Sequence, residues 1–199
     1  RDHSIRDKPC KIIKVDIDAD EGLISIWNNG TGIPVRVHEE HNLYIPEMIF
    51  GHLLTSSNYE QKGKIVGGKN GYGAKLANIY STDFWVETAD KKSKKSYVQH
   101  FYNNMYDKDE PVIKSLGDKG KSYTCIKFKP DFDKFGINGL SDDMVSLFKK
   151  RVYDIAACTQ NNVKVYLNNT LVNIKNFQEF ISMFYDNNDE DAVYSKPIY

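Results

Sequence analysis

The chain has 199 residues, of which 40% are hydrophobic and 13% aromatic. This is the length of one domain with enough apolar material for a core, so wholesale disorder is not expected, and no apolar run approaches the ~18 residues of a membrane-spanning helix. The 27 basic and 27 acidic side chains cancel to a net charge of zero. A nucleic-acid grip over the whole surface needs excess positive charge, so only a local basic pocket for a small anion remains open.

The first residues, Arg1 to Ser4, contain no initiator Met, apolar h-region or cleavage-site pattern, so they do not form a signal peptide. We expect the chain to be a piece of a longer protein, with part of what its function needs placed before Arg1. The cysteines at 10, 125 and 158 form no CxxC or Cys/His cluster. We therefore expect three buried, reduced thiols in an intracellular protein, without a disulfide or structural zinc.

A hairpin is the first element that the pattern predicts. Apolar and charged residues alternate over 12–18, residues 19–22 have the composition of a turn, and a second strand follows over 23–27. Residues 28–34 read Asn-Asn-Gly-Thr-Gly-Ile-Pro and contain too many turn formers for regular structure. The hairpin is therefore expected to end in a glycine-containing loop.

A helix, a long loop and a second helix are expected next. Pro46 suits a first helical turn, and apolar residues continue at helical spacing to Leu54. Glycine, serine, asparagine and lysine dominate residues 55–73, and a loop of this length is usually a lid, a binding loop or disordered. Residues 74–80 then form a short helix that the glycines lead into.

The second half of the chain completes the expected fold. The remaining elements are three strands, a helix, a hairpin and a last helix, over 83–89, 96–103, 122–129, 141–155, 163–174 and 177–184. Ser141 is a suitable N-cap, and the helix after it carries Met144, Phe148, Val152 and Ile155 on one face. Antiparallel hairpins with grouped helices predict an α+β fold, a two-layer sandwich with helices on one face of a mostly antiparallel sheet. Residues 186–191 are acidic and Asn-rich, as in a solvated linker.

Two glycine loops carry the chemistry that the sequence indicates. Glycine allows positive φ angles and lets a ligand approach without a Cβ in the way. The second loop, Gly67 to Lys75, leads into a predicted helix, so free N–H groups and the positive end of a helix dipole meet two lysines there, as in phosphate sites. Its spacing fits neither a P-loop nor a dinucleotide-binding loop. Taken alone it fits a flexible surface loop equally well, and the first loop, 28–34, favours a nucleotide pocket.

Three segments together resemble one protein family. They are residues 28–34, residues 44–59 (Tyr-Ile-Pro-Glu-Met-Ile-Phe-Gly-His-Leu-Leu-Thr-Ser-Ser-Asn-Tyr) and residues 67–76 (Gly-Gly-Lys-Asn-Gly-Tyr-Gly-Ala-Lys-Leu). In order and spacing they resemble the ATPase region of eukaryotic type IIA DNA topoisomerases, which belongs to the GHKL superfamily of gyrase, histidine kinases and MutL. The resemblance implies a Bergerat-type nucleotide-binding domain over 1–185, followed over 186–199 by a linker and the possible start of a transducer domain.

The resemblance also implies an ATP site with Mg²⁺ as the accompanying ion. The positions that match the family's ATP-binding residues are Arg1, Asn28, Gly30, Gly32, Ile33, Ser56, Ser57, Asn58, Gly68, Lys69, Asn70, Gly71, Tyr72, Gly73, Ala74, Lys75 and Thr124. Asn28 would accept a hydrogen bond from the adenine amine, and Lys75 would pair with phosphate charge. Lys69 replaces the family's usual Arg and lacks its bidentate fork. Thr124 fits direct nucleotide contact and a filled pocket wall equally.

The same resemblance places the catalytic groups before Arg1. In this family a helix immediately upstream carries the Glu that activates the attacking water and the Asn that binds Mg²⁺. We therefore assign no catalytic or metal-binding residue within the 199 residues, and we expect nucleotide binding without hydrolysis. The glutamates at 39, 40, 47 and 60 do not match the missing motif and are expected to be surface charges.

In this family, ATP binding dimerises two such domains around a duplex DNA, and hydrolysis resets the gate. The resemblance therefore implies a homodimeric, nuclear enzyme that contacts DNA mainly through other domains and has no membrane partner. Two alternatives remain open. One is a sensor histidine kinase of the same superfamily, against which residues 54–59 argue, and the other is a non-catalytic dimerisation module.

Two further clusters are given structural interpretations. His38 and His41 have a spacing typical of metal ligands, but no third ligand is evident near them, so we expect surface histidines. Lys91 to Lys95 form a basic run that could touch a DNA backbone, and a solvated hairpin turn is the simpler interpretation.

Overall fold

The computed structural model describes residues 9–53, 71–160, 162–174 and 176–184, and within them nine strands form one mixed sheet. The strands are β1 Ile12–Asp18, β2 Leu23–Asn28, β3 Ser81–Asp90, β4 Lys95–Tyr102, β5 Asp107–Lys108, β6 Val112–Ser115, β7 Tyr123–Pro130, β8 Lys164–Leu167 and β9 Thr170–Leu171. Their order in space is β5-β4-β3-β7-β2-β1-β8-β9, and β6 pairs with β4. The pair β1 and β8 runs parallel, and the other described pairs run antiparallel.

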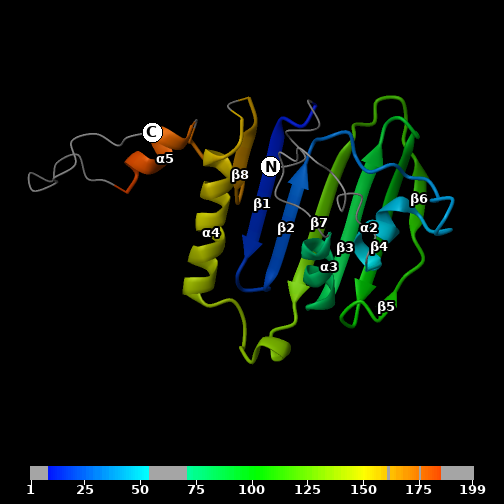
Figure 1. Cartoon of the computed structure of the whole chain (residues 1–199), viewed down its shortest axis with the longest axis horizontal. Coiled ribbons are helices and arrows are strands. Elements are labelled where there is room, and N and C mark those ends of the chain that lie inside the picture. Colours follow the sequence, from blue (N-terminus) through cyan, green and yellow to red (C-terminus); the bar gives the residue numbers. More distant parts are fainter. Residues whose placement is uncertain (1–8, 54–70, 161, 175, 185–199) are drawn as a thin grey trace, which may run out of the picture.

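Helices cover one face of this sheet in the described part of the chain. Those on this face are α2 Ile45–Gly51, α3 Tyr72–Ile79 and α4 Asp142–Ala157; α5 Phe177–Ser182 packs against α4, and the 3-10 helix η1 Asp133–Phe135 follows β7. Figure 1 shows α3 in front of β7 and β3, and α2 in front of β3 and β4; both helices contact these strands. α4 contacts β8 near the other edge. The predicted two-layer α+β sandwich is therefore confirmed, and none of the described helices has the length and apolarity that crossing a bilayer demands.

The parallel pairing of β1 and β8 joins the two ends of the described chain. Ile13 pairs with Val165, and Val15 pairs with Leu167. Asn168 then uses its side-chain amide on the backbone of Ile17, accepting from the amide nitrogen at 2.7 Å and donating to the carbonyl oxygen at 3.1 Å. The partners of these two bonds are 151 residues apart in the sequence. The first strand is therefore held in place by one of the last.

Two buried clusters make up the core. The larger side chains lie between the sheet and the helices α2 and α3, and the members of this cluster are Val35, Phe50, Phe84, Val86, Tyr97 and Phe101. The second cluster lies between α4 and the strands β1 and β8, and its members are Cys10, Ile13, Val152, Ala156, Val163, Val165 and Val172. Alternation along the strands places these apolar side chains on the helix-covered face, as the sequence pattern predicts.

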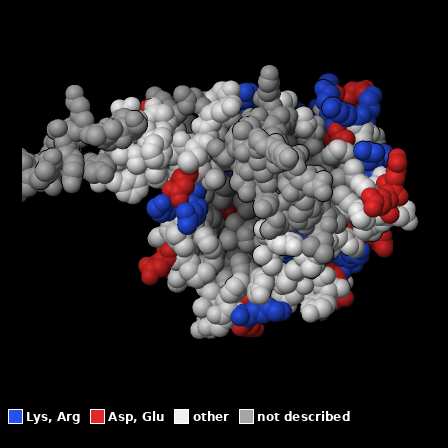
Figure 2. Space-filling view, viewed as in Figure 1, with Lys and Arg blue, Asp and Glu red and all other residues white. Residues whose placement is uncertain are grey.

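An apolar groove of about 640 Å³ separates the two clusters. Its floor comes from β1, β2 and β7, one wall from α3 and the other from α4; the lining side chains include Ile13, Val15, Ile17, Ile24, Ile26, Ala77, Phe128, Met144, Phe148 and Ile155. Figure 2 shows this face hollowed beside α4. The predicted apolar face of α4 is confirmed, but Ile155 remains 37% exposed because it faces the groove.

Several expectations were wrong. The short strands β5 and β6 and the helix η1 were not predicted, because two to four polar residues at a sheet edge give no periodic signal. Cys10 and Cys125 are buried as expected, but Cys158 is exposed at the C-cap of α4. Glu47 is also buried, against the expectation of a surface charge, because it pairs with Lys108. The proposed domain boundary at residue 185 lies outside the described residues and stays a prediction.

Phe84→Ala tests the core between the sheet and α2. Phe84 is 1% exposed and its ring lies against those of Phe50, Phe101 and Phe128. Removing it should lower the free energy of unfolding by about 3–5 kcal/mol, as measured by denaturant unfolding followed by circular dichroism. Phe177→Ala, at a site 54% exposed, is the matched control and should cost under about 1 kcal/mol. Equal losses in the two variants would contradict this core assignment.

Candidate nucleotide-binding site

Three polar side chains stand in one row across the sheet, on β2, β7 and β3. Asn28 pairs with Thr124 across β2 and β7, and Thr124 pairs with Thr88 across β7 and β3. Directly paired residues point to the same face of a sheet, and alternation places Thr124 on the face of Ile126 and Phe128. That face is the one the helices cover. The row therefore forms a polar end to an otherwise apolar layer.

Thr88 connects this row to the first glycine loop. Its side chain is fully buried, and its hydroxyl donates to the carbonyl oxygen of Tyr123 at 2.9 Å. The same oxygen accepts the backbone N–H of Ile33 at 2.9 Å and lies 3.1 Å from the hydroxyl of Thr124. Since the proton of Thr88 goes to Tyr123, the hydroxyl of Thr124 is the donor in the last contact. One hydroxyl thus fixes the loop, the strand β7 and Thr124 together.

Asn28 retains the hydrogen-bonding capacity that an adenine amine requires. Its side-chain oxygen accepts the backbone N–H of Gly30 at 3.0 Å, which closes a local turn at the start of the loop. A carbonyl oxygen has two lone pairs, so one acceptor position and the amide donors remain. Asn28 is half-buried at the end of its strand. The residues present therefore fit the edge of a base, although the role of Asn28 itself stays a prediction.

Gly32 is required by a close contact within the protein. It has a φ of +80°, and an added Cβ would lie 2.1 Å from the backbone oxygen of Ala89. No side chain fits there, because both the conformation and the distance exclude one. The glycine therefore allows the first loop to lie against the end of β3, next to Thr88. Approach of a base to Gly30 and Gly32 stays a prediction.

Lys75 is a buried cation in the first turn of α3, the helix that follows the second glycine loop. The loop ends at Gly71, whose φ of 69° is left-handed, and α3 begins at Tyr72. Lys75 is only 2% exposed, and its ammonium donates to the carbonyl oxygen of Gly71 at 3.3 Å. No acidic side chain of the described residues forms an ion pair with it, and burial lowers the pKa of its ammonium. A buried cation that has no acidic partner in the described part of the chain fits a phosphate group.

Of the other predicted ATP-binding residues, some lie in the described part of the chain and some lie outside it. Tyr72, Gly73 and Ala74 are exposed in the first turn of α3, and a Cβ added to Gly73 would meet open space. Lys75 stands on the helix that packs on β3 and β7, and within the described chain no hydrogen bond or ion pair joins its ammonium to Asn28, Thr124 or Thr88. The predicted residues that lie outside the described residues are Arg1, Ser56, Ser57, Asn58, Gly68, Lys69 and Asn70.

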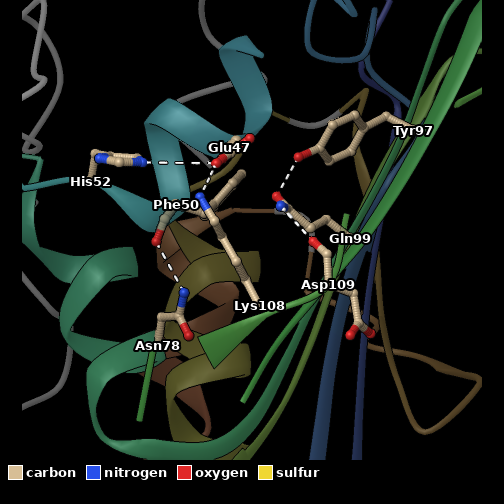
Figure 3. Close-up of polar contacts among 8 residues, drawn as sticks. All are labelled: Glu47, Phe50, His52, Asn78, Tyr97, Gln99, Lys108 and Asp109. Atoms are coloured by element: carbon tan, nitrogen blue, oxygen red, sulfur yellow. Dashed lines mark hydrogen bonds and ion pairs between the residues drawn. The ribbon is translucent and has the colours of Figure 1, made fainter. Parts of the chain in front are cut away.

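A polar network that the sequence did not reveal anchors α2 and α3 (Figure 3). The side chain of Asn78, one turn after Lys75, donates to the carbonyl oxygen of Phe50 at 3.1 Å and so ties α3 to the end of α2. Glu47 of α2 pairs with Lys108 of β5. Both Glu47 and Asn78 are at most 5% exposed. These contacts fix where the second glycine loop rejoins the described chain, at Gly71.

A neighbouring pair completes the anchor on β4. The hydroxyl of Tyr97 donates to the side-chain oxygen of Gln99, and the amide of Gln99 donates to the carbonyl oxygen of Asp109 at 3.0 Å. Burial raises the pKa of the Tyr97 hydroxyl, which therefore remains a neutral donor. Figure 3 shows the two chains of contacts side by side. These local bonds hold the helices over β3 and β4, and among the described residues they leave the buried Oδ1 atom of Asn78 without a hydrogen-bond partner.

Comparisons with known proteins show which family this chain resembles in sequence and in structure. No protein-family model matches the chain. DNA topoisomerase 2 of Acanthamoeba polyphaga mimivirus is 52% identical over 193 residues, which is 96% of this chain and 15% of that protein. The crystal structure of the ATPase region of Saccharomyces cerevisiae topoisomerase II is 47% identical with a TM-score of 0.88, and the match covers 92% of this chain and 48% of that one. The chain belongs to the topoisomerase II ATPase family.

The chain matches only a small part of its relatives, and this limits what its family membership shows. The chain spans only 12% to 15% of the length of the curated topoisomerase 2 relatives, so it corresponds to one part of them. The ATPase domain of Thermus thermophilus gyrase B, 22% identical with a TM-score of 0.64, shares the fold alone. Both likenesses confirm the GHKL fold that the sequence predicts. Membership of the topoisomerase II ATPase family does not favour the sensor histidine kinase or the non-catalytic module.

The Thr88 hydroxyl is the site feature that the sequence least suggests. The one available signal is its place in β3, where alternation puts a polar residue in line with the buried Phe84 and Val86.

Thr88→Val keeps the shape of the side chain but leaves the N–H of Ile33 without its hydrogen-bond partner. We expect it to lower the free energy of unfolding by about 1–3 kcal/mol in urea titration. Thr124→Val should cost less than about 1 kcal/mol, because the Thr124 hydroxyl contacts only Thr88 among the described residues. A smaller loss in the Thr88 variant than in the Thr124 variant would refute the role given to Thr88.

Proposed function

We propose that this chain is the ATP-binding domain of a type II DNA topoisomerase. The observation that carries the proposal is the buried ammonium of Lys75, which has one carbonyl oxygen as a partner and no carboxylate among the described residues. The row of Asn28, Thr124 and Thr88 supplies hydrogen-bonding groups of the kind that a base requires. The family supports both assignments, because its solved members are named as ATPase regions.

In the proposed site, each residue of this chain has a binding or positioning role. Asn28 accepts from the base amine, and Thr124 lies beside it and is oriented by Thr88. Lys75 holds phosphate charge at the start of α3, where the backbone N–H groups and the helix dipole also favour an anion. Bound ATP with Mg²⁺ supplies the phosphoryl group that is transferred to water. This chain binds and orients that group, and we propose that the general base and the Mg²⁺-binding Asn stand on the helix before Arg1.

The apolar groove fits the proposed upstream helix. It is open, about 640 Å³ in volume, and bounded by α3 and α4 with the strands β1 and β2 as its floor. Uncovered apolar surface of this kind normally carries a partner element. We propose that a helix preceding Arg1 lies in the groove. It would then reach the site from beside α3, the helix that carries Lys75.

The activity of the whole enzyme is proposed from the relatives alone. The relatives are named DNA topoisomerase 2, and the chain spans a small part of them. We propose that ATP binding dimerises two such domains, and that hydrolysis resets a gate through which duplex DNA passes. We also propose a nuclear location and a homodimer, with DNA contacted mainly by other domains. Of the basic run, residues 91–94 form the turn between β3 and β4, and Lys95 begins β4.

Lys75→Met separates binding from stability. We expect the chain to bind a non-hydrolysable ATP analogue with Mg²⁺ in isothermal titration, and the variant to bind at least about tenfold more weakly, since a charge-assisted hydrogen bond contributes about 1.5–3 kcal/mol.

Because burial depresses the pKa of Lys75 in the folded chain, the unfolded chain holds this proton more tightly. The charged ammonium therefore costs stability at neutral pH, and stability rises as the pH approaches the usual 10.5. The variant should be at least as stable as the parent and lose this rise.

The matched control is Lys149→Met, an exposed lysine of α4. It should change neither nucleotide affinity nor the pH dependence of unfolding. Absence of binding heat from a folded parent chain would refute the nucleotide site. A Lys75 variant that binds as the parent does would remove Lys75 from it.

A longer chain that includes the upstream helix tests the groove. We expect it to bind less of a hydrophobic dye than the 199-residue chain, to unfold at a higher temperature, and to release phosphate from ATP. The dye and unfolding measurements report on the groove, and phosphate release reports on the catalytic groups. A folded longer chain with full dye binding would contradict the placement of the helix. A folded longer chain without phosphate release would favour the non-catalytic module.

A further inference from the structure

A small backbone-closed turn precedes α2 and is independent of the nucleotide site. Val37 forms an isolated antiparallel bridge with Tyr44. The N–H of His38 donates to the oxygen of Leu43 at 2.7 Å, and the N–H of Asn42 donates to the oxygen of His38 at 2.9 Å. Asn42 has a φ of 52°, a conformation that asparagine tolerates. The backbone of residues 37–44 is therefore fixed before any ligand binds.

This turn gathers three side chains that can ligate a metal ion. One ligand atom each from His38, Glu40 and His41 lies within 4.8 Å of the other two. The two imidazole rings are 5.0 Å apart between centroids and tilted by 33°. Glu40 and His41 are exposed, so a small adjustment of their rotamers can bring the ligand atoms to coordination distance. The sequence suggested surface histidines because no third ligand was evident, and the turn supplies Glu40.

His38 adds a second, independent observation. Its Nδ1 atom is buried and has no hydrogen-bond partner among the described residues. Buried side-chain nitrogens are normally satisfied by a donor, an acceptor or a metal ion. The His38 side chain is partly buried while Glu40 and His41 face solvent, so an ion can enter from the exposed side. The unpartnered nitrogen thus lies in the same residue that the cluster already offers as a ligand.

We propose that His38, Glu40 and His41 bind a divalent transition-metal ion, with zinc as the best match. Two imidazoles and one carboxylate, with water in the fourth position, form a common tetrahedral zinc set. Mg²⁺ and Ca²⁺ prefer sites made entirely of oxygen ligands and fit this cluster poorly. The bound ion cross-links the turn that leads directly into α2. This site is separate from the Mg²⁺ of the proposed nucleotide chemistry.

Titration of the purified chain with zinc chloride tests the proposal. We expect one zinc site per chain by isothermal titration, and a rise in unfolding temperature with zinc, because the ion binds the folded turn. His41→Ala and Glu40→Gln should each weaken zinc binding about tenfold or more, since even residues that only orient a ligand contribute about that much. Glu39→Gln is the matched control: it removes the adjacent exposed carboxylate, which is not in the cluster, and should bind zinc as the parent does.

A spectroscopic readout identifies the ligands. Cobalt(II) in place of zinc should give the visible absorption of a tetrahedral ion in the parent and in Glu39→Gln, and lose it in His38→Ala combined with His41→Ala. Circular dichroism confirms that each variant is folded. The proposal is overturned if the parent takes up no zinc, if the double histidine variant binds zinc as the parent does, or if Glu39→Gln weakens binding as much as Glu40→Gln.

Discussion

The register between β2, β7 and β3 is the constraint on which the rest of the structure depends. It places Asn28, Thr124 and Thr88 in one row, and a shift by one residue would turn each of them to the opposite face. The buried hydroxyl of Thr88 then holds the first glycine loop on the sheet. Gly32 permits the close approach that this bond requires. The proposed base site is therefore a product of strand pairing, and the loop follows from it.

Local patterns predicted the elements that have strong periodicity. Alternation identified the strands around Thr124 and Ile13, and the cap at Ser141 is formed, since its hydroxyl accepts the N–H of Met144 at 3.3 Å. Contacts between distant residues could not be predicted in this way. Glu47 is buried because Lys108 is its partner, 61 residues away. The hydroxyl of Thr88 likewise contacts residues that only the folded sheet brings near, and single-sequence periodicity contains no such information.

Two features of the described chain cost stability. Lys75 is a charge held away from water with little compensation, and the groove between α3 and α4 leaves apolar area exposed. Neither improves the folding of this chain by itself. Both are explained if binding partners complete them, a phosphate in one case and an upstream helix in the other. Stability given up at such places is typical of sites that must accept a ligand.

The pairing of β1 with β8 also has a kinetic consequence. During synthesis β1 emerges before β8, because its parallel partner and the side chain of Asn168 follow some 151 residues later. Until then one edge of β1 exposes unpaired backbone groups, which is the state most prone to mispairing and aggregation. Closing so long a loop is entropically costly, so this edge forms late and slowly. The described sheet is therefore complete only after β8 has been made.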